Sequence, residues 1–305
     1  HLTSTSILEL DEVPRHLAIL GGGPVGLEFA QMFARFGAAV TIVELGSHLL
    51  DREDPDVSEE LRSILEDEGV TVWTDAETRR VEDLQSGGAR LVVDTPDGRA
   101  ELVASHLLVA AGRIPNSDLL DLDKAGVDTD DQGYILVDDR CRTVVPGIWA
   151  LGDVTGSPPF THIAYDDYRV VAADVLPGRE PRSRSGRQLP YCIYTDPELG
   201  RVGLTEREAE EQGRTIQVAK LPMSSWARAI EMGETRGFVK CLVDPEDEDI
   251  VGVAALGVHG GEIMSVLQTA MMGGLPYTAI RDGIYAHPTL AESLQNLFAT
   301  VSDDA

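Results

Sequence analysis

Positive charge is scarce in this sequence of 305 residues. Lysine occurs three times, and 25 basic residues face 52 acidic ones, which gives a formal net charge of −27. A negative charge of this size repels phosphate backbones and anionic lipid surfaces, so we expect neither nucleic acid nor a membrane as a partner. Long apolar runs are also missing. The longest, residues 250–258, falls far short of the roughly 20 residues that a membrane-spanning helix needs.

Cysteine is rare as well. Cys141, Cys192 and Cys241 are odd in number and far apart, which argues against a disulfide framework and fits a reducing compartment. We interpret all three as inert thiols, because no pair among them has the spacing of a redox motif, and we predict no metal site. The first residues include Glu9 and show neither a basic segment nor a long apolar one, so no secretory signal is visible. These absences predict a cytoplasmic protein.

The apolar pattern predicts an α/β fold. Residues 16–44 read as a strand, a glycine turn, an amphipathic helix and a strand, and a further helix and strand follow, as in a doubly wound parallel sheet. Alternating segments over 78–104 indicate an inserted antiparallel meander, and residues 147–153 (GIWALGD) a short strand. Residues 177–188, rich in Gly, Pro, Ser and Arg, are the clearest linker. After it, strands followed by helices, one of them starting at Pro288, predict an α+β domain.

Gly21, Gly23 and Gly26 form a GxGxxG pattern between the first strand and helix. In a dinucleotide site these glycines permit a tight turn, close approach of the pyrophosphate and close packing of helix on strand. Glu44 ends the second strand, where a carboxylate accepts hydrogen bonds from ribose hydroxyls and repels a 2′-phosphate. The pattern predicts NAD binding and favours NADH over NADPH. Two alternatives stay open: the glycines form a plain glycine-rich turn, and Glu44 is a solvated glutamate at a strand end. The nearby Arg52 would weaken the preference for NADH over NADPH.

Several segments occur in the order seen in the pyridine nucleotide-disulfide oxidoreductases: GGGPVGLEFA, LLVAAGRIPN, GIWALGDVTG, TDPELGRVGLTEREA and YAHPTLAES. The chain resembles this family, which includes dihydrolipoyl dehydrogenase, glutathione reductase and mercuric reductase, and is most similar to the mercuric-reductase-like subgroup. The resemblance implies a Rossmann-like NAD-binding domain over residues 1–114, the C-terminal segment of an FAD-binding domain over 115–180, and a dimerisation domain over 189–305. It also implies a homodimer formed through the last of these.

The resemblance implies that residues at matching positions contact the family's cofactors. Glu28 and Gly112 would lie near the nicotinamide, Asp153 would bind the ribityl chain of FAD, and residues 160–164 would pass the flavin ring. The full set of cofactor residues implied is Gly21, Gly22, Gly23, Pro24, Val25, Gly26, Glu28, Glu44, Gly112, Asp153, Phe160, Thr161, His162 and Ala164. Without the resemblance, Glu28 is an ordinary acid in the first turn of a helix, and Asp153 is a capping residue.

His287 and Glu292 are the candidate catalytic pair. Pro288 favours a helix start, and Glu292 lies five residues after the histidine. An imidazole held by a carboxylate is oriented and made more basic, as a general acid–base near neutral pH requires. Read alone, the pattern favours a structural histidine. The resemblance implies that the pair reaches across a dimer interface to the partner's flavin and redox thiols.

The sequence also departs from the family. It has neither the N-terminal FAD strand and glycine loop nor a CxxxxC redox pair, and it begins with His1 instead of Met, so we expect a fragment of a longer protein. Mercuric reductases typically end in a cysteine pair, whereas this chain ends FATVSDDA, which puts mercury in doubt.

We therefore expect part of an FAD-dependent NAD(P)H oxidoreductase. It would pass electrons from NADH through FAD to a small-molecule, disulfide or metal-ion acceptor, and this piece alone, with half of the FAD site, would be inactive. Dihydrolipoyl dehydrogenase is an alternative within the class. An alternative of another class is an NAD-binding and dimerisation module without flavin chemistry.

Overall fold

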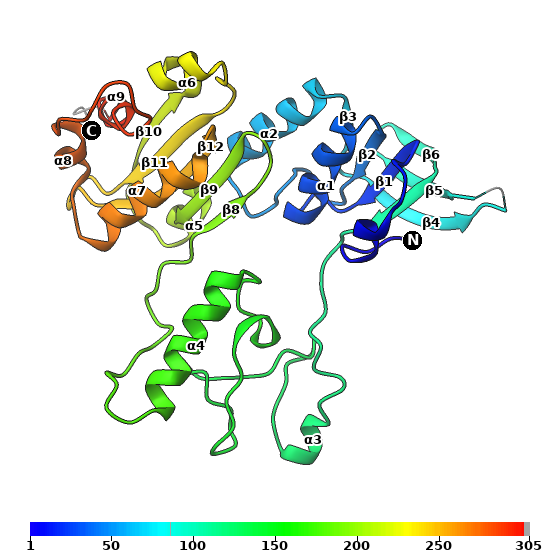
Figure 1. The fold of residues 1–305 in the computed structure, drawn as a ribbon, viewed down its shortest axis with the longest axis horizontal. Helices are drawn as coiled ribbons and strands as arrows, with labels where there is room; N and C mark the ends of the chain where they lie inside the picture. Colours follow the sequence, from blue (N-terminus) through cyan, green and yellow to red (C-terminus); the bar gives the residue numbers. More distant parts are fainter. Residues whose placement is uncertain (86, 302–305) are drawn as a thin grey trace. The chain divides into compact units, whose positions relative to one another are not determined.

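The chain folds into two compact units in the computed structural model, which describes residues 1–85 and 87–301 (Figure 1). One unit combines residues 1–111 with the chain from residue 190 onward, and the other consists of residues 112–189. Among the described residues, no helix is both long and apolar enough to span a membrane.

A parallel sheet forms the centre of residues 1–111 (Figure 1). In order across the sheet, its strands are β3 (Val70–Trp73), β2 (Ala39–Val43), β1 (His16–Leu20) and β7 (His106–Val109). The 3-10 turn η1 (Ser6–Glu9) precedes β1, α1 (Pro24–Arg35) follows it, and α2 (Pro55–Asp67) follows β2. Residues 17–19 of β1 are fully buried and apolar, as expected for a parallel strand covered on both faces. The predicted doubly wound arrangement is confirmed.

The register of this sheet fixes where the glycine turn lies. Leu20, the last residue of β1, pairs with Val43, the last residue of β2. Parallel strands that end together place the segments following them at the same edge of the sheet. The glycine turn after Leu20 and Glu44 after Val43 are therefore neighbours.

The predicted meander is an antiparallel sheet. Its strands are β4 (Glu77–Asp83), β5 (Ala89–Thr95) and β6 (Gly98–Ala104). Thr95 pairs with Gly98, so Pro96 and Asp97 form the two-residue turn that the sequence predicts. Of the other predicted turn, Ser86 lies outside the described residues, while Gly87 and Gly88 both adopt a positive φ.

The C-terminal part of the larger unit is an antiparallel sheet with helices. The strands, in order across the sheet, are β10 (Gln217–Pro222), β11 (Phe238–Val243), β12 (Ile250–Gly257), β9 (Glu198–Gly203) and β8 (Tyr191–Ile193). The helical segments are α5 (Glu206–Glu211), η3 (Met223–Ser225), α6 (Ala227–Met232), α7 (Gly260–Met272), α8 (Tyr277–Arg281) and α9 (Ser293–Phe298). Helix α7 packs on β9 and β12, and a Cβ atom at Gly200 would lie 2.5 Å from the Gly260 carbonyl oxygen.

Residues 112–189 contain α3 (Leu122–Ala125), η2 (Gly152–Thr155) and α4 (Thr161–Val175) but no strand. The strand expected over 147–153 is therefore wrong: Trp149 forms one isolated bridge with Arg142, and the segment then turns into η2. Val127, Ile135 and Ala150 form the centre of a small apolar cluster. So small a core cannot bury a large apolar surface.

Two further expectations need correction. No helix starts at Pro288: the Ser293 amide donates to the Leu290 carbonyl and the Leu294 amide to the Ala291 carbonyl, which is turn geometry, and the helix begins at Ser293. The segment 177–188 ends next to the boundary between the two units, as the linker prediction requires, but it is not free. Its arginines form ion pairs with Asp166 and Asp167 of α4, which attach it to the smaller unit.

Candidate functional site

The glycine turn between β1 and α1 has the geometry of a phosphate-binding loop. Gly21 adopts a φ of +108°, and a Cβ atom there would lie 2.6 Å from the Ala110 carbonyl oxygen. A Cβ atom at Gly26 would lie 2.2 Å from the Gly21 carbonyl oxygen. At Gly23 no atom lies within 4 Å of the Cβ position. Two of the glycines thus serve the packing of the turn, whereas Gly23 faces open space in which a bulky anion has room.

The N-terminus of α1 completes this loop. The helix starts at Pro24, its N-cap Gly23 provides no side-chain cap, and its first turn, which includes Val25, contains no acid. Amides in the first turn of a helix have no partner within the helix, and the helix dipole favours an anion there. Residues 21–26 therefore suit the pyrophosphate of a dinucleotide.

Glu44 joins the glycine turn to the loop that follows β2. Its carboxylate accepts hydrogen bonds from the amides of Gly22, over 2.5 Å, and Gly46, over 2.6 Å. Each carboxylate oxygen has two lone pairs, so both oxygens keep acceptor capacity for ribose hydroxyls. The side chain lies where the sequence predicts it, beside the glycine turn.

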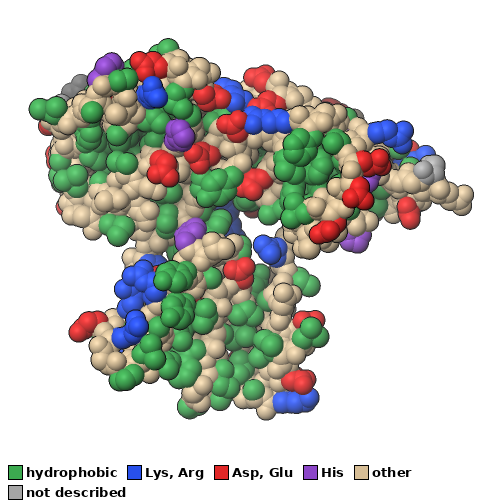
Figure 2. All heavy atoms as spheres, in the orientation of Figure 1, with side chains coloured by type: hydrophobic (Ala, Val, Ile, Leu, Met, Phe, Trp, Pro, Cys, Tyr) green, Lys and Arg blue, Asp and Glu red, His purple; other side chains and the backbone are tan. Residues whose placement is uncertain are grey.

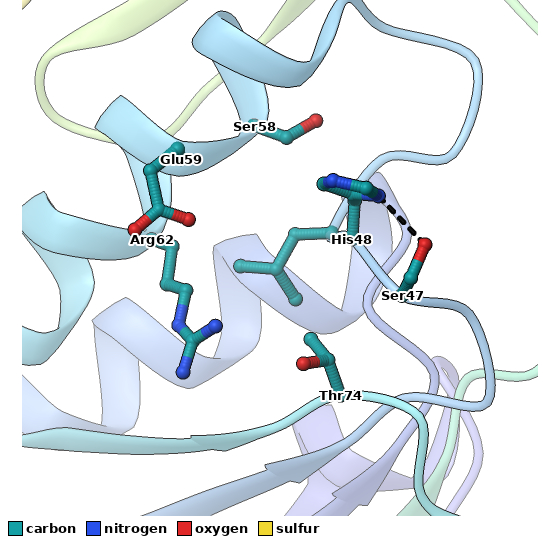
Figure 3. Close-up of a pocket in the computed structure, with 7 residues that line it drawn as sticks. Ser47, His48, Ser58, Glu59, Arg62 and Thr74 are labelled. Carbon is teal, nitrogen blue, oxygen red and sulfur yellow. Dashed lines mark hydrogen bonds between the residues drawn. The ribbon is translucent and has the colours of Figure 1, made fainter.

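A small pocket lies between the loop after Glu44, helix α2 and the residue that follows β3 (Figure 3). Figure 3 shows His48 and Ser47 from that loop, Glu59 and Arg62 from α2, and Thr74 after β3 around it. The His48 Nδ1 and Ser47 Oγ atoms are 2.7 Å apart. The pocket volume of about 10 Å³ matches a single water molecule, so it cannot accommodate an adenine ring.

Glu28 lies beyond the first turn of α1, which corrects the interpretation as a first-turn acid. Its carboxylate accepts a hydrogen bond from the Tyr194 amide over 2.8 Å. One turn further along the helix, the Gln31 side chain donates to the Asp196 carbonyl over 2.8 Å and accepts from the Asp196 amide over 2.7 Å. Helix α1 is thus attached to residues 194–196 of the C-terminal part, and a role of Glu28 at the nicotinamide stays a prediction.

The residues expected at the flavin lie in the unit 112–189, and so does Gly112, which was expected near the nicotinamide. Asp153 is exposed within η2, and Gly112 is exposed with a φ of +128°. The expected flavin segment starts α4: the Phe160 ring stacks on His162 at 5.5 Å, and Thr161 and His162 are exposed. Helix α4 has no side-chain cap hydrogen bond at Phe160. An exposed carboxylate suits the hydroxyls of FAD, and the positive end of a helix suits its pyrimidine carbonyl.

His287 and Glu292 form the predicted pair. The Nδ1 atom lies 2.8 Å from Glu292 Oε1 and 3.1 Å from Oε2. The His287 side chain is 71% exposed and that of Glu292 16%. Thr289 supports the turn between them by donating to the Ala286 carbonyl. The carboxylate thus orients the ring and directs Nε2, to which no hydrogen bond is recorded among the described residues, outward.

A cluster of charges around a buried lysine was missed at the sequence level. The Lys240 Nζ atom lies 2.8 Å from Asp54, 2.6 Å from Asp56 and 2.7 Å from Glu206. These three carboxylates could hold a metal ion, but the ammonium of Lys240 already lies among them. The available signal was a lysine in the apolar strand sequence FVKCLV, since a buried lysine requires acidic partners.

A second buried pair lies nearby. Arg201 Nε is 3.2 Å from Glu53 Oε2, and the Tyr191 hydroxyl donates to the same carboxylate. Burial raises the pKa of Glu53. Arg201 and Tyr191 lower this pKa by a smaller amount, so the net effect is a raised pKa. The three residues link the loop before α2 to strands β8 and β9.

The cysteines are free thiols. Burial raises the pKa of Cys141 to about 11 and that of Cys192 to about 12, and it also raises the pKa of Cys241. Because the thiolate is the reactive form, all three are poor nucleophiles near neutral pH. This agrees with their interpretation as inert.

Known families match most of the chain. Residues 1–167 match the pyridine nucleotide-disulphide oxidoreductase family, and residues 189–298 match the dimerisation domain of the same family. The probable pyridine nucleotide-disulfide oxidoreductase RclA of Escherichia coli is 42% identical over 299 residues, which are 98% of this chain and 66% of RclA. A mercuric reductase of Streptomyces lividans is 36% identical over 304 residues, 100% of this chain and 64% of that protein.

Solved structures agree with these matches. The HOCl-induced flavoprotein disulfide reductase RclA from Escherichia coli superposes with a TM-score of 0.91 at 40% identity, covering 99% of this chain and 68% of that chain. LpdA from Mycobacterium tuberculosis superposes with a TM-score of 0.87 at 26% identity, covering 97% and 63%.

The chain spans about two thirds of the length of these relatives. The glycine turn lies within the first family match, and the His287–Glu292 pair lies within the second. The family uses FAD and a pyridine nucleotide, and its last domain mediates homodimerisation. This chain therefore belongs to the pyridine nucleotide-disulfide oxidoreductase family.

Proposed function

We propose that the chain is the NAD-binding, partial FAD-binding and dimerisation portion of an oxidoreductase that passes electrons from NADH through FAD to a disulfide or metal-ion acceptor. The His287–Glu292 pair carries the proposal. A module that only bound NAD and dimerised would have no use for an exposed imidazole oriented by a carboxylate, whereas acid–base chemistry needs this arrangement.

Different residues of this chain would bind the two cofactors and transfer the proton. The glycine turn and the N-terminus of α1 would hold the pyrophosphate, and Glu44 the adenosine ribose. Asp153 would hold the ribityl chain, with the amides at the start of α4 near the flavin ring. FAD, when bound, would supply the hydride acceptor and the electron relay. His287 Nε2 would give a proton to the acceptor or take one from it, while Glu292 keeps the ring oriented.

The surface of the smaller unit supports an incomplete FAD domain. Tyr165 is 64% exposed and Tyr168 51%, and Leu119 and Ile114 are each 87% exposed. Figure 2 shows hydrophobic side chains over much of the visible face of residues 112–189. A strand-free unit with this much exposed apolar surface needs further chain to cover it, which is what we infer for the rest of the FAD domain.

The C-terminal part also exposes apolar side chains, which supports dimerisation through it. Ile284 is 100% exposed, Met272 73% and Val266 45%. Hydrophobic side chains are visible on the surface around α7 and α8 (Figure 2). Such a patch suits an isologous contact with a second copy.

The visible spectrum of the purified full-length protein tests the proposal. We expect a yellow dimer whose flavin band bleaches on anaerobic addition of NADH and returns when the acceptor is added. Lipoamide and Hg(II), supplied in parallel, separate a dihydrolipoyl dehydrogenase from a mercuric-reductase-like enzyme. A colourless dimer that binds NADH would refute the oxidoreductase and support the module.

The coenzyme preference has its own test. Because the Glu44 carboxylate would repel a 2′-phosphate, we expect the wild type to prefer NADH over NADPH. Glu44→Gln removes the charge with little change in size, and the ratio of kcat/KM for NADH to that for NADPH should fall at least about tenfold, the equivalent of about 1.4 kcal/mol. An unchanged ratio would assign the preference to other residues.

A further inference from the structure

Asp167 is a fully buried acid in the unit that carries the expected flavin residues. It lies on α4, and its relative exposure is 0%. Its Oδ2 atom accepts a hydrogen bond from the Gly152 amide over 2.9 Å and from the Ser157 hydroxyl over 3.4 Å. A buried carboxylate is costly unless it is paired and hydrogen-bonded, so these contacts have a structural purpose.

The counter-charges come from the segment that the sequence marks as a linker. Arg187 Nη1 lies 2.7 Å from Asp167 Oδ1, and the Arg187 side chain is only 14% exposed. Arg184 Nε lies 3.5 Å from the same oxygen, and Arg184 also donates to the Ser157 hydroxyl. The arginines thus enclose the carboxylate on the side away from Gly152.

Gly152 is the residue immediately before Asp153, the expected ribityl contact. It adopts a φ of +73°, and a Cβ atom there would lie 3.1 Å from the Ala164 Cβ atom. Ala164 and Asp167 are three residues apart on α4 and so lie on one face of the helix. That face contacts the turn through Ala164 and bonds it through Asp167.

The same helix begins with residues 160–164, the other expected flavin contact. The orientation of α4 relative to the Gly152–Asp153 turn therefore sets the position of the Asp153 carboxylate relative to the helix N-terminus. Bound FAD would have to contact the Asp153 carboxylate and the N-terminus of α4 at the same time.

We propose that Asp167 is a positioning residue for the flavin site: with Arg187 and Arg184, it fixes the turn that carries Asp153 against helix α4. It touches no cofactor atom and acts through Gly152. This inference rests on the proposed function, because it assumes that Asp153 and the start of α4 hold FAD.

The test compares two neighbouring acids in the full-length protein. Asp167→Asn keeps the size of the side chain but loses the charge that faces Arg187. Asp166→Asn is the matched control, because Asp166 pairs with Arg182, Arg169 and Arg187 but has no recorded bond to the turn. The FAD dissociation constant is measured by equilibrium dialysis, together with the flavin absorption band, flavin fluorescence, and the circular dichroism and thermal midpoint of the apoprotein.

We expect Asp167→Asn to weaken FAD binding at least tenfold and to raise the fluorescence of the flavin that stays bound, with apoprotein circular dichroism like that of the wild type. Asp166→Asn should stay within about twofold of the wild type. If Asp167→Asn fails to fold, Arg187→Gln serves instead and should weaken FAD binding by a smaller factor in the same direction.

The inference is overturned if Asp167→Asn, or Arg187→Gln in its place, binds FAD as the wild type does, or if Asp166→Asn loses as much affinity as Asp167→Asn. Failure of the proposed function gives a different result, since the wild-type protein itself would then bind no FAD.

Discussion

Lys240 donates a hydrogen bond to Asp56 over 2.6 Å, although the two residues are 184 positions apart in the chain. Asp56 lies in the first turn of α2, and Lys240 lies in β11 with 2% of its side chain exposed. Burial lowers the pKa of Lys240, but hydrogen bonds to three carboxylates outweigh it, and the net effect is a raised pKa. The lysine is therefore charged, and it joins the parallel-sheet region to the C-terminal region.

Removing this charge should destabilise the protein strongly. Lys240→Met would leave the carboxylates of Asp54, Asp56 and Glu206 together without their shared cation, so we expect a loss of about 3–5 kcal/mol in the free energy of unfolding, measured by urea denaturation. Lys220→Met is the control. Lys220 is 42% exposed; it pairs with Asp56 and lies 3.9 Å from the centre of the Phe238 ring. Exposed contacts of these kinds are weak, so its loss should cost only about 1 kcal/mol. Equal losses would show that the buried pairing has no special role.

The same cluster predicts an acid-sensitive fold. Burial raises the pKa of Asp56, but Lys220 and Lys240 lower it more, and the result lies below the ordinary value of 3.8. The folded state then binds the proton less tightly than the unfolded state, so the stabilisation is complete well above pH 3.8 and is lost as the pH falls through and below that value.

Thermal midpoints from about pH 6 to about pH 3 measure this effect. The difference between the wild type and Asp56→Asn should shrink on acidification, because the variant has no carboxylate to protonate. Asp97→Asn, which removes the carboxylate of an exposed turn, is the control. A constant difference for Asp56→Asn across the range would contradict the prediction.

Two glycines of the nucleotide loop should respond differently to alanine. Gly23 has a φ of −81° and open space at its Cβ position, so Gly23→Ala should fold with a change in stability within about 0.5 kcal/mol yet bind NADH at least about tenfold more weakly. Gly26→Ala would place a Cβ atom 2.2 Å from the Gly21 carbonyl oxygen and should destabilise the fold itself by about 2 kcal/mol or more. Titration calorimetry with NADH and thermal unfolding separate the two effects. NADH binding at full strength in Gly23→Ala would argue against a pyrophosphate at this loop.

Glu292 should matter for turnover and not for folding. Glu292→Gln keeps the side-chain shape but removes the charge that orients His287, and we expect kcat of the full-length enzyme to fall about 10²-fold. The thermal midpoint should hardly change, since His287 is 71% exposed. Glu231→Gln, which alters another partly exposed acid, should leave kcat unchanged. A normal kcat for Glu292→Gln would show that the charge of Glu292 has no role in turnover.

Local structure in residues 1–111 could be predicted from the sequence in detail. The strand before Gly21 and the helix after Asp54 both appear as predicted, because apolar periodicity, glycine and proline act within a few residues. The turn at Pro96 and Asp97 follows for the same reason. The pairing of His287 with Glu292 was also predictable, since only five residues separate them.

Contacts between distant segments were not predictable. Nothing in the sequence indicates that Glu28 accepts from the Tyr194 amide, 166 positions away, or that Arg187 in the apparent linker neutralises buried Asp167. Pro288 shows the opposite error: a local rule favours a helix start there, but the chain first forms a turn over residues 290–292, and the helix starts only at Ser293.

By itself, the sequence determined the order of strands, turns and helices in residues 1–111, the glycine turn and the family, because these depend on side-chain pattern and backbone freedom over short stretches. Only the tertiary structure decided which charges neutralise one another, among them Lys240 with Asp56 and Arg187 with Asp167. Such pairs form where segments meet in space, and since almost any arginine or lysine can pair with almost any acid, their spacing in the chain carries no signal.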